Sequence, residues 1–92
     1  MQAFKAFITG ANLVHSQPKQ ASALLERATQ LDPNFVDAWL YLGLANIGLG
    51  EIQRENEDLR RAFALRGRAS GGKKQRIEAM YYLDVTGGLQ GD

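Results

Sequence analysis

The sequence predicts an all-α domain of two helical hairpins followed by one additional helix. Apolar residues recur three or four positions apart along most of the 92 residues, which is the spacing of one face of a helix. Proline and glycine interrupt this pattern where helices would end. The two predicted hairpins also resemble each other at a fixed shift, which indicates an internal repeat.

The first hairpin is predicted from its periodicity and its two prolines. Apolar residues predict a helix over residues 1–15, although Gly10 inside it costs about 1 kcal/mol relative to alanine unless another helix packs closely there. Pro18 is typical of a first helical turn, so the second helix is expected to begin there and to continue to about Leu31. Pro33 disfavours helical structure at the residue before it and ends the hairpin.

The second hairpin begins with a helix over residues 34–50 that is apolar on nearly every side. Such helices are normally buried between neighbours, so we expect Trp39 to be buried between the two hairpins. The fourth helix is predicted over residues 51–66, where Arg54 and Asp58 form a stabilising pair four positions apart. A fifth helix is expected over residues 73–85, and residues 86–92, with three glycines, are expected to fray.

The composition is that of one globular domain spanning residues 1–92, with 45% hydrophobic and 23% charged residues. No run of 18 apolar residues exists, so no transmembrane helix is expected, and the N-terminus lacks the pattern of a secretory signal. There is no cysteine, which fits a reducing compartment. We therefore expect a cytoplasmic protein that does not associate with a membrane.

The two hairpins align when one is shifted onto the other by a constant interval. The aligned pairs are Ile8 with Leu42, Asn12 with Asn46, Leu25 with Leu59, and Ala28 with Ala62. A helix-turn-helix period of this length, with Trp39, Leu42 and Gly43 in the spacing of the Trp-x2-Leu-Gly signature, resembles the tetratricopeptide repeat family. The resemblance implies a short α-solenoid with repeat one over residues 2–35, repeat two over residues 36–69, and an additional helix over residues 73–86. Residues 76–82 and 85–88 are similar to bacterial tetratricopeptide regions attached to kinases or regulators.

The resemblance implies a protein–protein interaction module, a scaffold or adaptor whose concave groove is lined by the first helix of each pair. Its groove positions fall on Leu13, Val14, Asp37, Leu40, Leu44 and Ile47. Because these residues are mostly aliphatic, the groove suits an amphipathic helix or a second copy of the chain. One departure from the family is Glu55, which occupies a position where a small alanine is usual. A lone buried carboxylate is costly, so either the helix pair opens there or Glu55 reaches solvent or a basic partner, and a solvated edge is the favoured interpretation.

A basic stretch supports the alternative function, a small binder of nucleic acid or of an anionic surface. Residues 60–76 contain seven basic residues and no acidic one. The candidate anion patch within the stretch consists of Arg66, Arg68, Lys73, Lys74 and Arg76. The stretch lacks interleaved aromatic residues for base stacking, so we favour a solvated face and expect no nucleic-acid ligand. An affinity that falls steeply with salt would identify the alternative.

No enzyme or cofactor is predicted. Residues 67–73 match the Gly-x4-Gly-Lys pattern of a phosphate-binding loop, but Lys74 stands where serine or threonine should hold magnesium, and a helix precedes the loop instead of a strand. His15 is the only histidine and there is no cysteine, so no metal site is expected. Spacing supports no set of nucleophile, base and acid.

The last helix predicts self-association. Ile77, Met80, Tyr81 and Val85 form an apolar stripe that is expected to pack on the fourth helix, while Tyr82 and Leu83 lie towards the other side. In a longer repeat array a following helix would cover that side. We therefore predict a homodimer that uses Met80, Tyr81, Tyr82 and Leu83 as its contact surface, with a monomer that binds a different protein as the competing outcome.

Overall fold

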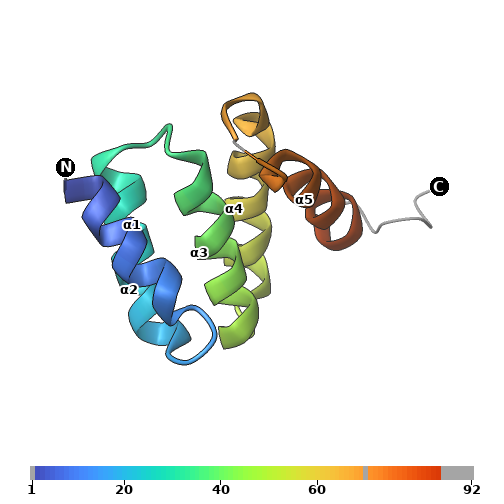
Figure 1. Cartoon of the computed structure of the whole chain (residues 1–92). Coiled ribbons are helices and arrows are strands. Elements are labelled where there is room, and N and C mark those ends of the chain that lie inside the picture. Colours follow the sequence, from blue (N-terminus) through green and yellow to red (C-terminus); the bar gives the residue numbers. More distant parts are fainter. Residues whose placement is uncertain (1, 70, 86–92) are drawn as a thin grey trace.

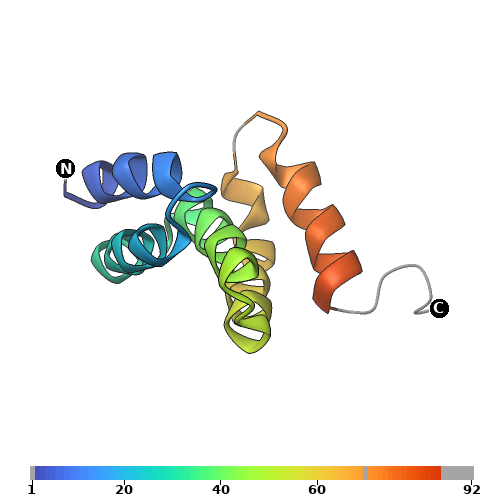
Figure 2. The same ribbon diagram turned by 90° about the horizontal axis from the view of Figure 1, so that it is seen from below.

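The protein is an all-α stack in which consecutive helices run in opposite directions (Figure 1). The structure, a computed structural model, describes residues 2–69 and 71–85. Its helices are α1 (Gln2–Leu13), α2 (Pro18–Leu31), α3 (Val36–Leu49), α4 (Ile52–Ala64) and α5 (Lys73–Met80), with a 3₁₀ turn η1 (Arg66–Arg68) and a π-helical turn η2 (Tyr81–Val85). Helices α1 and α2 form one pair, α3 and α4 form the second, and α5 with η2 packs on α4 (Figure 2).

Local chemistry places most helix ends where the sequence predicts them. Pro18 is the first residue of α2, and the Asp32 N–H donates to the carbonyl of Ala28 where α2 ends. Gly50 ends α3 with a φ of 72°, a left-handed conformation that glycine adopts without steric cost. The fifth helix differs from the prediction, because its α-helical part ends at Met80 and continues as η2. The expectation for residues 86–92, and residue 86 of the additional helix that the resemblance implies, lie outside the described residues.

Two of the apolar clusters among the described residues are the larger ones, and a third consists of Ala6, Ala28 and Ala38. One lies between the two pairs, and its buried members are Val14, Ala21, Leu25, Leu42 and Ala45. The other lies between α3, α4 and α5, with Val36, Leu40, Leu59, Ala62 and Ile77. Trp39 contacts both clusters, but it is half-buried, so the expectation that it is buried between the two hairpins holds only in part. Its indole N–H donates to the Pro33 carbonyl at 2.8 Å, and the Arg61 guanidinium lies 5.2 Å from the ring centre.

One glycine in each pair, Gly10 or Gly43, allows the two helices of that pair to approach each other closely. A Cβ added to Gly10 would lie 2.8 Å from Leu25 Cγ, and one added to Gly43 would lie 3.2 Å from Leu59 Cδ2. The cost of Gly10 within α1 is thus offset by close packing against α2. In both pairs, a glycine of the first helix packs against a leucine of the second.

These contacts correct the predicted alignment of the two pairs. Leu25 and Leu59, which the repeat aligns, are both fully buried, as it predicts. In the sequence, however, Gly10 and Gly43 are separated by one position fewer than Leu25 and Leu59. Because the two glycines make the equivalent contact, the first helices of the two pairs are offset by one position from the predicted alignment. Consistent with this offset, Ile8 is 43% exposed whereas Leu42 is 3% exposed. Asn12 is likewise exposed whereas Asn46 is buried.

Candidate partner-binding surfaces

The predicted concave groove is not an open apolar surface. Leu40 is fully buried in the cluster that contains Ile77, and Val14 is buried in the cluster between the pairs. The assignment of these two residues to a partner-binding groove is therefore wrong, because neighbouring helices already cover them. Leu13 and Leu44 are half-buried against the same inter-pair cluster, and Ile47 alone among the predicted aliphatic residues is exposed.

The remaining predicted groove residue, Asp37, is engaged within the chain. Its Oδ2 lies 3.6 Å from Lys73 Nζ, so the first turn of α3 is paired with the first turn of α5. Asp37 Oδ1 is buried without a hydrogen-bond partner. This ion pair also weighs against the phosphate-loop match, since the lysine that would reach a phosphate is held by a carboxylate.

Arg66, another member of the basic stretch, takes part in a stack with two aromatic rings. This stack and an ion pair join α4 and η1 to α5 and η2. The Arg66 guanidinium carbon lies 3.8 Å from the centre of the Phe63 ring, and the Tyr81 ring stacks on Phe63 with centroids 3.9 Å apart. Arg66 Nε donates to Glu78 Oε2 at 3.1 Å, and Arg66 Nη1 donates to the Phe63 carbonyl at 2.8 Å. Of the predicted anion patch, this leaves Arg68, Lys74 and Arg76 exposed.

The outer side of the last helical segment is the apolar surface that the sequence predicts. Ile77 is fully buried, and Met80 and Val85 pack on the same cluster, so the inner stripe is confirmed. Leu83 is 59% exposed and Tyr82 is 52% exposed, although the Tyr82 ring also contacts Phe63 edge-on. Of the predicted contact surface, Met80 and Tyr81 are half-buried within the chain, so Tyr82 and Leu83 are the members that face solvent.

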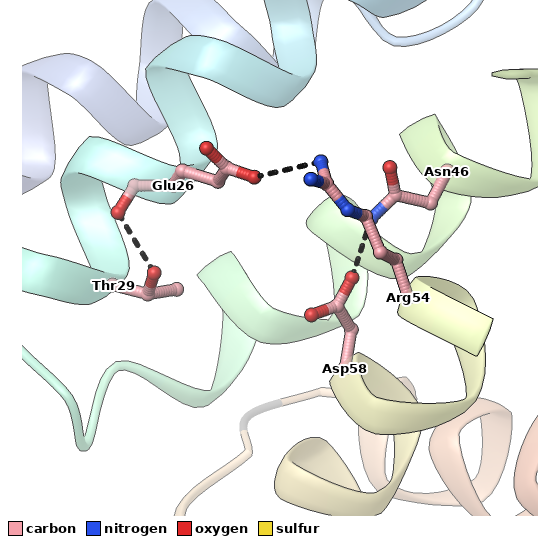
Figure 3. A network of polar contacts seen from close by, with 5 residues as sticks. All are labelled: Glu26, Thr29, Asn46, Arg54 and Asp58. Atoms are coloured by element: carbon pink, nitrogen blue, oxygen red, sulfur yellow. Dashed lines mark hydrogen bonds and ion pairs between the residues drawn. The ribbon is translucent and has the colours of Figure 1, made fainter. Parts of the chain in front are cut away.

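A polar network lies between α2, α3 and α4 and was not predicted (Figure 3). Asn46 Nδ2 donates to Asp58 Oδ2 at 2.6 Å, and both residues are buried. Arg54 Nη1 lies 3.6 Å from Glu26 Oε2, so the ion pair of Arg54 reaches α2 instead of joining Asp58 as predicted. Glu26 and Arg54 also line an open cleft of about 450 Å³ between α2 and the turn from α3 to α4. The overlooked signal is Asn46 itself, a polar residue in a mostly apolar helix.

Burial raises the pKa of Asp58 to about 7. The hydrogen bond from Asn46 and the charge of Arg54 lower it, while the charges of Glu26 and Glu57 raise it. Desolvation prevails because the carboxyl is surrounded by helices and Arg54 is directed to Glu26. The second pair therefore buries a carboxyl that titrates near neutral pH.

Glu55 is a second buried carboxyl on α4, one turn before Asp58. It is 8% exposed, so the interpretation as a solvated edge is wrong. Among the described residues, the groups that perturb its pKa include the Asp84 carboxyl of η2 and no cation. Burial, the hydrogen bond with Asp84 and the Asp84 charge together raise the pKa of Glu55 to about 7.

Comparison with known proteins identifies no relative: neither family models, nor curated proteins, nor solved structures match the chain. In the part of the chain that the structure describes, no helix is long and apolar enough to cross a membrane. Within those same residues, no three His, Asp or Glu side chains converge as a metal site would require, and His15 is exposed.

Proposed function

We propose that the chain is a helical protein–protein interaction module without enzymatic activity, built in the manner of tetratricopeptide repeats. The observation that carries the proposal is the outer side of η2, where Leu83 exposes 59% of its surface beside a half-exposed Tyr82. Large apolar side chains that share one face mark contact sites for other proteins. The buried pairs Leu25–Leu59 and Ala28–Ala62, which recur at the predicted repeat interval, support the repeat architecture.

We propose a second copy of the chain as the partner of this surface. A two-fold dimer places the same patch of both subunits in contact, so Leu83 of each chain would be buried by its mate. Removing apolar area from water gains about 25 cal/mol per Å², which favours covering such a face. The exposed cations Arg68, Lys74 and Arg76 leave the anion-binding alternative open to a salt titration.

Sedimentation equilibrium at micromolar concentration tests the dimer. We expect a two-chain mass for the wild type and a one-chain mass for Leu83→Glu, because the substitution would bury a charge in the contact. Gln75→Glu is the matched control, since it adds the same charge at an exposed position of α5 and should leave the dimer intact. A one-chain mass for the wild type would overturn self-association, and a dimer in Leu83→Glu would overturn this surface as its contact.

A further inference from the structure

An open groove of about 300 Å³ lies between α1 and α2, at the opposite end of the stack from α5 and η2 (Figure 2). It is lined by Gln2, Lys5, Ala6, Thr9, Leu24 and Arg27. Its apolar part consists of Ala6, which is buried, and Leu24, which is half-buried. Lys5 and Arg27 are exposed, so each of the two helices contributes one cation beside the apolar part.

Both cations of the groove are available to an external anion. Among the described residues, neither Lys5 nor Arg27 forms an ion pair. Helix α1 contains no acidic residue, and the single acidic residue of α2, Glu26, is paired with Arg54 of α4. Asp37, the acidic residue of α3, is paired with a lysine of α5. A carboxylate that binds in the groove would therefore displace no ion pair of the described residues.

The occupant that suits these features carries both an aliphatic group and carboxylates. An aliphatic side chain seated on Ala6 and Leu24 would be removed from water, and carboxylates beside it would pair with the two cations. A phosphate, whether free or in a nucleic-acid backbone, would pair with the cations but would leave the apolar part of the groove uncovered. The groove therefore favours an acidic peptide.

We propose that the groove between α1 and α2 binds an extended acidic peptide segment of a partner protein, in which one aliphatic residue stands between two carboxylates. Alternate side chains of an extended segment share one face, so the pattern acid-x-aliphatic-x-acid presents all three side chains to the groove. The proposal rests on the proposed function of a protein–protein interaction module but not on the dimer, because Leu83 belongs to η2 at the other end of the stack (Figure 2).

Titration of the intact chain with the peptide acetyl-Glu-Ser-Leu-Ser-Glu-amide, followed by amide chemical shifts in NMR spectra, tests the site. We expect saturable shifts at residues 5–9 and 24–27. The analogue with glycine in place of leucine should bind about fivefold more weakly, because it loses the apolar contact. The analogue with glutamine in place of both glutamates should lose the attraction to the cations, and its affinity should not depend on salt.

Variants of the chain locate the contact. Lys5→Gln and Arg27→Gln should each weaken binding about threefold, a loss typical of one exposed ion pair. Lys19→Gln is the matched control, since it removes the same charge from an exposed position of α2 outside the groove and should leave the affinity unchanged. Leu83→Glu should also bind with the wild-type affinity, so failure of the dimer and failure of the groove are distinguishable.

Four outcomes would overturn the proposal. The first is the absence of saturable shifts at residues 5–9 and 24–27. The second is a set of shifts centred on Lys74 and Arg76, which would assign the peptide to the anion patch. The third is equal binding of the glycine analogue, or of inorganic phosphate, which would indicate a simple anion site. The fourth is an equal loss of affinity in Lys19→Gln, which would reduce the effect to the overall charge of the chain.

Discussion

The two helical pairs share one close contact but surround it with different chemistry. In the first pair, Leu24 and Leu25 of α2 pack against Gly10, whereas in the second pair Asp58 and Leu59 of α4 pack against Gly43. Three positions beyond each glycine stand Leu13 and Asn46, respectively. Leu13 and Leu24 of the first pair therefore occupy the places that Asn46 and Asp58, which are hydrogen-bonded to each other, occupy in the second.

The glycine–leucine contact sets the distance between paired helices, while its neighbours set how the pair responds to pH. The side-chain atoms closest to Gly10 in the first pair belong to leucines, which do not titrate. The second pair buries Asp58, whose pKa burial raises to about 7. A buried polar pair can be replaced by apolar residues at little cost, but removal of one member leaves the other without a partner.

The largest effect on stability is expected when only one member of the Asn46–Asp58 pair is replaced. Asn46→Leu removes the hydrogen bond to a buried carboxyl, so we expect a loss of about 3 kcal/mol in the free energy of unfolding at pH 8. The loss should be smaller at pH 5, where Asp58 is protonated. Urea unfolding followed by circular dichroism measures both values.

The double variant Asn46→Leu/Asp58→Leu is the control, because it gives the second pair the side chains of the first. It should recover most of the stability that the single variant loses. If the double variant is as unstable as Asn46→Leu, the two pairs are not interchangeable at these positions.

A smaller effect is expected from pH alone. Asp58 binds its proton more tightly in the folded chain, since its pKa of about 7 exceeds the ordinary value of 3.8. The stabilisation is fully present below pH 3.8 and is lost as the pH rises through 7, so Asp58 alone should make the domain about 2.5 kcal/mol less stable at pH 8 than at pH 5. In Asp58→Asn the slope should shrink to the contribution of Glu55. An equally steep slope in that variant would assign the pH dependence to other groups.

The helices themselves could be predicted because local signals determine them. Pro18 starts α2 and Gly50 ends α3, and both act through backbone conformations that need no distant partner. The register of α1 could not be predicted in this way. Helix α1 ends three positions after Gly10, whereas α3 ends six positions after Gly43, and the turn after α1 is two positions longer than the turn after α3. The separation between the glycine and the start of the second helix therefore differs by one position, and this difference depends on how the two helices of each pair pack.

The candidate surfaces were predicted in part. The apolar stripe of the last helix follows from spacing alone, and Leu83 is exposed as that spacing requires. Leu40 was assigned to a groove by analogy with longer repeat arrays, whereas α5 brings Ile77 into the same buried cluster. The environment of Glu55 depends on Asp84, which is distant in the sequence and returns to α4 across a turn whose course spacing does not specify.

The smallest effects on stability should come from replacing the two glycines, and the difference between the two variants compares how tightly each pair is packed. A Cβ at Gly10 would lie 2.8 Å from Leu25 Cγ, a branch point that cannot move without shifting the side chain, so Gly10→Ala should cost about 1–2 kcal/mol. At Gly43 the nearest atom is Leu59 Cδ2 at 3.2 Å, a terminal methyl that can rotate away. The higher helix propensity of alanine, worth about 1 kcal/mol, should there offset the crowding and leave stability within about 0.5 kcal/mol of the wild type. Thermal unfolding of both variants at pH 5, where Asp58 is protonated, isolates the packing contribution. Equal losses in the two variants would show that the first pair is no more tightly closed than the second.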